Sequence, residues 1–183
     1  MKLIRICSCA VALLILLWPS KGFSQDKESK IPLNITITHA AREIMSAAGT
    51  CTLITLDQEG RPRARVMDAF LPEDDFTVWL GTNSKSRKVT QIKNDPRVTL
   101  FYLDQDASGY VMIHGQAQIV DDPIEKQERW KEEWEAFYQN KEEAYLLIKV
   151  TPEWMEVISN TRNIVGDPLS WEPQKVLFDG THK

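Results

Sequence analysis

Hydroxyl and basic side chains are concentrated in the segment Thr82–Lys88, which leads from an apolar stretch into a short amphipathic one. Cations and hydroxyls at a helix start, with free backbone N–H groups and the positive end of the helix dipole, suit a phosphate group of charge about −2. A solvated basic helix start is the equally weighted alternative, because short basic clusters are common. The hydroxyls belong to Thr82, Ser84 and Ser86, and the cations to Lys85, Arg87 and Lys88.

A further basic residue, Arg65, lies in a predicted strand over residues 63–70. The two-residue period of a strand places Arg63, Arg65 and Met67 on one face. An arginine in a strand is often a surface residue that pairs with an acid on the next strand. Arg65 therefore belongs to a phosphate site only if the segment Thr82–Lys88 lies beside it.

No other residues form a recognisable catalytic or metal-binding pattern. His114 has no visible partner on the more polar face of its predicted strand, which favours a surface or interface position over catalysis. Cys51 lies in an apolar stretch without neighbouring cations, which favours a buried, unreactive thiol. The spacing of His, Cys, Asp and Glu matches no metal site, and we assign no catalytic residue.

The first 24 residues have the features of a secretory signal peptide. Lys2 and Arg5 precede an apolar run, Pro19 ends it, and small residues lead to a cleavage site before Gln25. The run is shorter than the ~20 residues that span a bilayer; an uncleaved anchor is the alternative. We therefore expect an exported protein, periplasmic or secreted, that contacts a membrane only through an uncleaved signal segment.

The remaining chain divides into a lead-in and one folded domain. Residues 25–37 are polar and are expected to be flexible, and residues 38–183 are expected to fold around their own core. Removing the three basic residues of the signal segment lowers the net charge from −4 to −7 and leaves Cys51 as the sole cysteine. An intramolecular disulfide is then impossible, and the acidic charge argues against nucleic-acid binding.

Short stretches of alternating hydrophobicity, separated by turns, dominate this domain. Thr38 and Asp122 are the expected caps of two helices. The aromatic and aliphatic residues of the last helix are expected to pack on the sheet, and a contact with a second copy of the chain is the alternative. The absence of a strand–helix–strand rhythm indicates a mainly β protein, an antiparallel barrel or sandwich with added helices. The pattern predicts strands at 50–56, 63–70, 76–81, 97–103, 110–120, 145–150, 154–159 and 175–178, and helices at 38–48, 86–94 and 122–139.

Several motifs, in order and spacing, resemble the FMN-binding split-barrel superfamily, the pyridoxamine 5′-phosphate oxidase-like group, and within it the general stress protein 26-like branch. They are Gly60–Met67, Trp79–Lys88, Asn94-Asp95-Pro96 and Gly115 in a long strand. The resemblance covers residues 38–123 well and the C-terminal part loosely. It implies an antiparallel split β-barrel with helices.

The resemblance also implies roles for individual residues. Arg65, with Ser86, Arg87 and Lys88, would hold the phosphate of FMN. Thr82 and Asn83 would lie near the ribityl chain or the ring, and the backbone of Val66 and Met67 would meet the polar edge of the isoalloxazine. Members of this family are homodimers with flavin at the subunit interface. Tyr110 would face that interface, and Trp171 would cover the ring.

Two departures from the oxidase pattern argue against a vitamin B6 oxidase. Phe70 replaces the lysine that ends the oxidase motif beginning at Arg65, and the C-terminal Arg-Leu-x-Pro signature is absent near Trp171. Together with the predicted signal segment, the resemblance therefore implies an exported FMN-binding flavoprotein, an oxidoreductase acting on a small-molecule redox substrate. The alternatives are a non-catalytic flavin-binding or stress-related module, and the same fold binding deazaflavin F420 or haem, with His114 as the candidate axial ligand.

Overall fold

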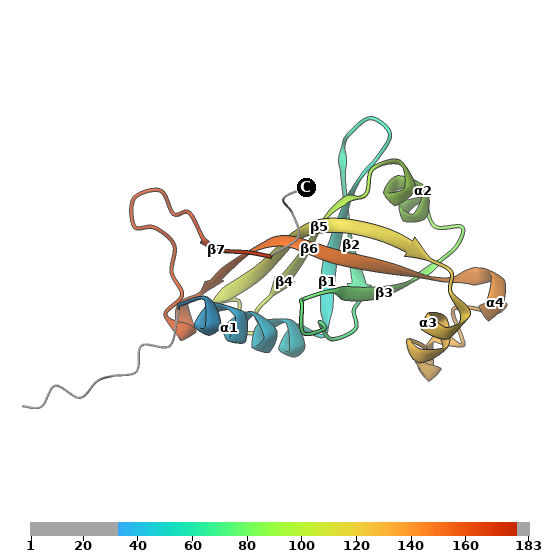
Figure 1. Ribbon diagram of the computed structural model, residues 1–183, viewed down its shortest axis with the longest axis horizontal. Helices are drawn as coiled ribbons and strands as arrows, with labels where there is room; N and C mark the ends of the chain where they lie inside the picture. The colour runs from blue at the N-terminus through green and yellow to red at the C-terminus, as the bar shows by residue number, and fades with distance from the viewer. Residues whose placement is uncertain (1–32, 179–183) are drawn as a thin grey trace, which may run out of the picture. The chain divides into compact units, whose positions relative to one another are not determined.

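The computed structural model describes residues 33–178, which form one antiparallel sheet of seven strands with accompanying helices (Figure 1). The strand order is β2-β1-β4-β5-β6-β3, and β7 pairs with β6 outside this path. The sheet curls into a half-barrel, which confirms the predicted mainly β, antiparallel split barrel. The predicted signal peptide, residues 1–24, lies outside the described residues. The strands are β1 (Thr50–Leu56), β2 (Pro62–Asp68), β3 (Val78–Asn83), β4 (Arg97–Leu103), β5 (Gly109–Val120), β6 (Tyr145–Ser159) and β7 (Gln174–Leu177).

Strands β2 and β3, at the two ends of the sheet, meet at one point. Ala69 forms a single antiparallel bridge with Leu80, and the N–H of Phe70 donates to the carbonyl of Trp79 at 3.0 Å. Within residues 33–178, no ladder of pairs continues from this bridge. The split of the barrel therefore lies beyond it, where helix α2 (Arg87–Asn94) is hydrogen-bonded to both strands.

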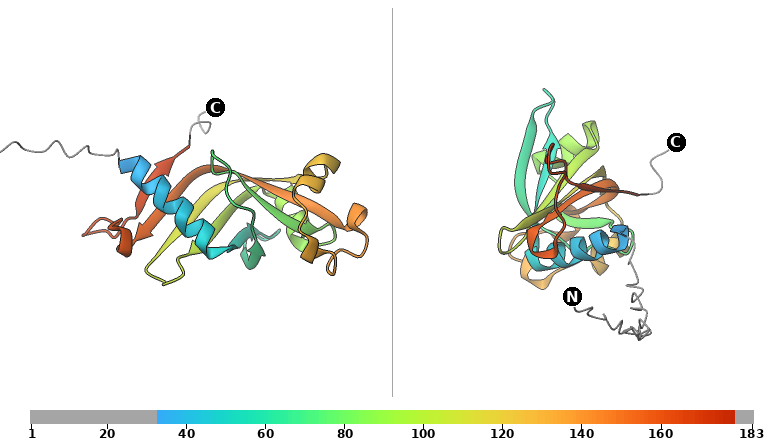
Figure 2. Two further views of the ribbon diagram at one scale, coloured as in Figure 1. Left: turned by 90° about the horizontal axis from the view of Figure 1, so that it is seen from below. Right: turned by 90° about the vertical axis from the view of Figure 1, so that its left-hand side faces the viewer.

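Helix α1 (Leu33–Ala48) lies along one face of the sheet and supplies much of the core (Figure 2). Its inward side chains are buried among core residues of β1, β4, β5 and β6, such as Leu53 and Leu100. The helix begins five residues before the predicted cap Thr38, so the end of the predicted lead-in is helical. Ile37, only 1% exposed, extends the apolar face by a turn, and the Thr38 hydroxyl donates within the helix to the carbonyl of Asn34 at 2.9 Å.

The two strands predicted at 145–150 and 154–159 are one long strand, β6, that contains a bulge. The pairing of β5 with β6 shifts register after His114, where Gly115 lies opposite Pro152. A proline is tolerated there because a bulge does not need every backbone N–H. Gly115 is required by the close approach of the two strands, since a Cβ on it would lie 2.1 Å from the carbonyl oxygen of Thr151.

The helix predicted over residues 122–139 is wrong in its length. Asp122 caps a helix as expected, accepting from the N–H groups of Ile124 and Glu125 at 3.0 Å each, but α3 (Pro123–Glu128) ends after six residues. A 3-10 turn (Glu132–Trp134) and helix α4 (Lys141–Ala144) follow. The side chains explain the break: Ile124 and Phe137 are 69% and 75% exposed, so the predicted apolar stripe does not face the sheet as one surface.

The remaining predicted elements agree with the structure to within two residues at each end. Strands 50–56 and 97–103 match β1 and β4, and helix 86–94 matches α2 apart from its first residue. Strand β3 starts at Val78 and not at the predicted residue 76, because Phe76 has a left-handed backbone with φ of 65°. Residues 33–178 include no helix long and apolar enough to span a bilayer.

Candidate functional site

The fold places Arg65 beside the segment Thr82–Lys88, which is the condition that the sequence left open. Arg65 is on β2, and its Nη2 donates to Oε1 of Gln91 on α2 at 3.0 Å. Helix α2 also carries Arg87 and Lys88 in its first turn. We call Arg65, Arg87 and Lys88 the cationic cluster.

Neutral acceptors hold Arg65 in this position. Its Nη1 donates to the hydroxyl of Thr55 at 2.7 Å and weakly to the carbonyl of Leu53 at 3.4 Å. Thr55 is fully buried, because the alternation of β1 turns it inward in phase with Leu53. The guanidinium of Arg65 is therefore oriented by a hydroxyl, an amide and a carbonyl, none of which carries a charge.

Lys88 joins the hydroxyls that the sequence singled out. Its Nζ donates to Oγ of Ser86 at 2.8 Å and to Oγ1 of Thr82 at 3.2 Å. Thr82 is 2% exposed, since it lies on the inner side of β3. The structure thus brings four predicted ligand-binding residues, Arg65, Thr82, Ser86 and Lys88, to the two sides of the opening between β2 and β3.

Within residues 33–178, no carboxylate lies within ion-pair distance of the cationic cluster. The nearby acid Asp57 is bound by Arg61 and Arg63 at 3.2 and 2.9 Å instead. Burial, and then the charges of Arg87 and Arg63, lower the pKa of Arg65. Burial, and then the charge of Arg65, lower the pKa of Lys88. Positive charge is therefore held at an energetic cost that a bound anion would relieve.

The start of α2 adds backbone donors to this charge. Ser86 is the N-cap with extended backbone angles, and its side chain makes no capping hydrogen bond. The turn before it is held by Asn83, whose carbonyl accepts from the N–H of Ser86 and whose Oδ1 accepts from the N–H of Lys85, each at 2.9 Å. Asn83 therefore shapes the loop. The N–H of Val89 donates to the carbonyl of Ser86 at 2.9 Å, which leaves the N–H groups of Arg87 and Lys88 at the start of the helix for an anion.

The two backbone positions predicted to meet the flavin ring lie on the edge strand β2. Val66 points outward and is 72% exposed, whereas the side chain of Met67 belongs to the core. Strand β2 has a ladder only with β1, so its other edge has no strand partner within residues 33–178 before the bridge at Ala69. The side chain of Met67 is therefore taken up by the core, whereas that of Val66 lies at the open surface of β2.

Two residues of the site, Gln91 and Thr55, were not predicted from the sequence. Gln91 follows Arg87 by four positions on α2, so helical spacing places it on the same side as that residue. Thr55 follows Leu53 by two positions on β1, so strand spacing turns it toward the inner face. Each signal was present in the sequence, but only the pairing of β1 with β2 and the packing of α2 beside them show that the two residues converge on Arg65.

An aromatic segment, residues 129–145, lies at the end of the opening where Ala69 forms its bridge with Leu80. The indole Nε1 of Trp134 donates to Oδ2 of Asp68, at the end of β2, at 3.0 Å, and the Lys131 ammonium binds Oδ1 of the same carboxylate at 2.6 Å. The carbonyl of Ala144 accepts from the N–H of Ser84 at 2.8 Å, within the loop that precedes α2. The segment therefore contacts both the end of β2 and the loop between β3 and α2, which is the candidate phosphate-binding loop.

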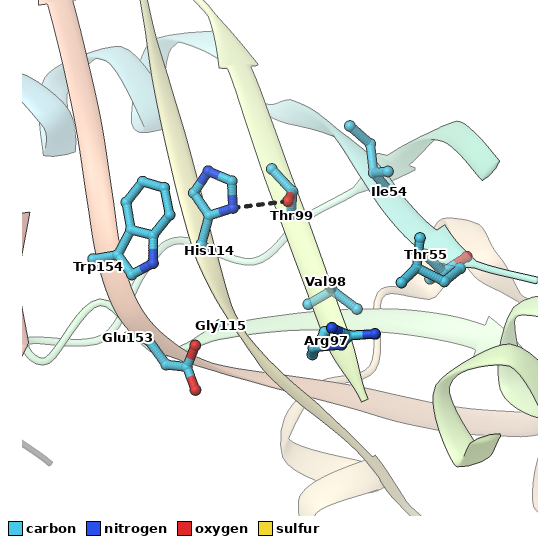
Figure 3. Close-up of a pocket in the computed structure, with 10 residues that line it drawn as sticks. Ile54, Thr55, Arg97, Val98, Thr99, His114, Gly115, Glu153 and Trp154 are labelled. Atoms are coloured by element: carbon cyan, nitrogen blue, oxygen red, sulfur yellow. Dashed lines mark hydrogen bonds between the residues drawn. The ribbon is translucent and has the colours of Figure 1, made fainter. Parts of the chain in front are cut away.

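His114 lies in a different place, in a surface pocket formed by β1, β4, β5 and β6 (Figure 3). Its ring stacks on Trp154 with centroids 3.7 Å apart, and its Nδ1 shares a hydrogen bond with the Thr99 hydroxyl at 3.1 Å. Its Nε2 is buried without a hydrogen-bond partner in the described residues. Nδ1 of the imidazole is therefore hydrogen-bonded and Nε2 is buried away from solvent.

The other residues named from the sequence are placed as follows. Cys51 is buried, as predicted, and burial raises the pKa of its thiol to about 12. Tyr110 is half-buried on β5, with its ring 5.4 Å from that of Phe101. Trp171 is 83% exposed and has a left-handed backbone with φ of 63°. No group of metal-ligating side chains occurs in residues 33–178.

Comparison with solved structures shows the same fold in several proteins. The chain is similar to general stress protein 26 from Bacillus anthracis (TM-score 0.61, 23% identity, covering 81% of this chain and 100% of that one). It is similar to a general stress protein 26-related protein of the pyridoxinephosphate oxidase family from Clostridium acetobutylicum (TM-score 0.61, 21% identity, covering 71% of this chain and 92% of that one). It also resembles a heme binding protein from Mycobacterium smegmatis (TM-score 0.53, 16% identity, covering 64% of this chain and 52% of that one).

A search of curated protein sequences gives no significant match. The family model described as pyridoxamine 5′-phosphate oxidase like, in contrast, matches residues 38–171, which include every strand from β1 to β6 and the whole cationic cluster. The chain therefore belongs to the pyridoxamine 5′-phosphate oxidase-like family.

Proposed function

We propose that the protein binds FMN and acts as an exported flavin-dependent oxidoreductase. The observation that carries the proposal is the cationic cluster: three basic side chains, unpaired by carboxylates within residues 33–178, beside the first turn of a helix. Phosphate monoesters are the ligand class that such a set of donors recognises best. Membership of the pyridoxamine 5′-phosphate oxidase-like family supports flavin as the ligand, because proteins of this family often bind flavin.

The residues present fit FMN from its phosphate toward its ring. Arg65, Arg87, Lys88 and Ser86 would hold the phosphate, and Thr82 and Asn83 would lie along the ribityl chain. The open edge of β2 at Val66 and Met67 would receive the polar edge of the ring. Bound flavin supplies the redox chemistry, and the chain supplies binding, orientation and a positive electrostatic environment.

Haem is a less suitable ligand, although one structural relative is a heme binding protein. Its iron would need an axial nitrogen, and His114 was the mid-chain candidate. Trp154 covers one face of the imidazole, Nδ1 is bonded to Thr99, and Nε2 is buried. The cationic cluster, by contrast, uses none of these residues and suits an anionic group.

The proposed assembly is a homodimer that completes each site. Side chains on the outer face of the sheet follow the strand pairing from β2 to β5: Val66 opposite Thr52, Thr52 opposite Phe101, and Phe101 opposite Met112. Val66 is strongly exposed and the other three are half-buried. A second copy of the chain is the proposed partner for this face, because it adjoins the edge of β2 that receives the ring.

The experiment is a titration of the protein lacking residues 1–24 with FMN and with riboflavin. Flavin fluorescence and the absorption spectrum report binding, light scattering reports the dimer, and oxidation of NAD(P)H separates an enzyme from a flavin-binding module. A preference for FMN over riboflavin supports the proposal. Equal or absent binding of the two flavins, or a Soret band in protein isolated with its ligand, would overturn it.

A further inference from the structure

Thr55, Arg65 and Gln91 form a closed triangle of hydrogen bonds. The Thr55 hydroxyl donates to Oε1 of Gln91 at 2.7 Å and accepts from Nη1 of Arg65 at 2.7 Å. Nη2 of Arg65 donates to the same Oε1 at 3.0 Å. Three elements, β1, β2 and α2, each contribute one residue, so the position of the guanidinium depends on all three.

The triangle orients Arg65 without neutralising it. Several other arginines in residues 33–178 are held by carboxylates, among them Arg63 by Asp57 at 2.9 Å and Arg97 by Asp95 through Nε at 2.9 Å. Glutamate and glutamine have nearly the same shape, so a carboxylate at position 91 would hold the guanidinium as well or better. It would also cancel the charge that faces the opening between β2 and β3. An uncharged amide there preserves both the geometry and the charge.

We propose that Gln91, supported by Thr55, is a positioning residue that gives the site its specificity for a phosphate monoester over the same ligand without phosphate. The inference rests on the proposed flavin site. Gln91 fixes Arg65 through Nη2 and Thr55 fixes it through Nη1, so the remaining N–H donors of the guanidinium are presented to the ligand in one orientation. Discrimination between FMN and riboflavin then depends on a neutral residue that need not touch the flavin.

The decisive variant is Gln91→Glu. A carboxylate at this position should form an ion pair with Arg65 and weaken FMN binding by about tenfold or more, the effect of losing one charge-assisted contact to phosphate. Riboflavin affinity should change less than twofold, so the FMN-to-riboflavin ratio collapses while the melting temperature is retained. Gln118→Glu is the matched control, since it adds the same charge on the exposed face of β5 and should leave the ratio unchanged.

A second pair of variants tests the triangle without adding charge. Thr55→Val keeps the shape but removes the hydroxyl, whereas Thr55→Ser keeps the hydroxyl. We expect the valine variant to lose much of the preference for FMN and the serine variant to keep it. If valine and serine variants of equal melting temperature show the same FMN-to-riboflavin ratio as the parent, the hydroxyl has no positioning role.

The outcomes separate this inference from the proposed function. A parent protein that prefers FMN, together with a Gln91→Glu variant that retains the full preference, overturns only the role of Gln91. A parent protein that binds the two flavins equally overturns the flavin proposal. In that case inorganic phosphate remains the probe: it should raise the melting temperature of the parent more than that of Gln91→Glu, and equal shifts would overturn the inference too.

Discussion

Trp134 lies directly against Gly81, so that a Cβ on Gly81 would be 2.5 Å from Cζ3 of the indole. The same position would bring the Cβ to 3.1 Å from the ring of Tyr145. Gly81 is the residue of β3 immediately before Thr82. Trp134 also donates a hydrogen bond to Asp68 at the end of β2. The absence of a side chain at Gly81 therefore lets the aromatic segment sit on the strand that leads into the cationic cluster.

The first prediction concerns this contact. Gly81→Ala should lower the free energy of unfolding by ~1–3 kcal/mol, because the added methyl overpacks a buried contact. In a Trp134→Ala background the same change should cost much less, since the clashing ring is gone. Chemical denaturation of the four proteins measures the coupling. Equal costs in both backgrounds would show that the indole does not constrain Gly81.

The second prediction concerns the contribution of each cation to ligand binding. Arg87→Ala or Lys88→Ala should weaken FMN binding by about tenfold or more, because a charge-assisted contact to phosphate contributes ~1.5–3 kcal/mol. Riboflavin binding should be little changed, since riboflavin has no phosphate. Lys93→Ala, at the far end of α2, is the control for loss of a basic residue on the same helix. Fluorescence titrations with both flavins make the comparison, and parallel losses would remove the cluster from the phosphate site.

The third prediction is a pH dependence of FMN binding. In the free protein the pKa of Lys88 is lowered by burial and by Arg65, whereas a bound phosphate dianion would raise it again. Affinity should therefore be full at pH values below the pKa in the free protein and fall as the pH rises through the interval up to the pKa in the complex. The measurement belongs above pH 7, where the phosphate, with a second pKa of about 6, is already a dianion.

A matched variant identifies the titrating group. Lys88→Arg keeps the charge at all accessible pH values, so it should flatten the alkaline fall in affinity. Lys93→Arg should not. Retention of the same alkaline fall in Lys88→Arg would assign it to a group other than Lys88.

The fourth prediction concerns Cys51. Burial raises the pKa of its thiol to about 12, and only the thiolate reacts with aromatic disulfides. In the protein lacking residues 1–24, no thiol should react at pH 8 under native conditions, and one should react after denaturation. A stoichiometric, rapid reaction of the native protein would place Cys51 at the surface and contradict the packing of β1.

The sequence predicted the strands well where one face is core and the other is not. Val111, Ile113 and Ala117 alternate with polar residues on β5, and the structure buries that face. Helix 122–139 was predicted too long because Trp130 and Trp134 have helical spacing. Both rings belong to a tertiary cluster with Tyr145, which no local pattern encodes. The break after α3 is therefore set by packing and not by propensity.

The site was predictable in its charged residues but not in the neutral ones that hold them. Arg87 and Lys88 are adjacent in the sequence, and their position before a helix indicates an anion site. Thr55 and Gln91 are 10 and 26 positions from Arg65, and their role depends on how β1, β2 and α2 pack. A buried threonine and a helical glutamine can serve many roles, and only the pairing of β1 with β2 together with the packing of α2 defines the role they have here.

The bulge opposite Gly115 has a consequence for how this chain tolerates changes of length. Core positions on β6 are Ile148 and Val150 before the bulge but Met155 and Val157 after it, so the two halves of the strand have opposite phase. The bulge takes up one extra residue, so inserting a further residue between Val150 and Met155 without a second bulge would turn Glu156 toward the core, where a carboxylate is costly. The number of residues in this strand is therefore more tightly constrained than the identity of most of its outward side chains.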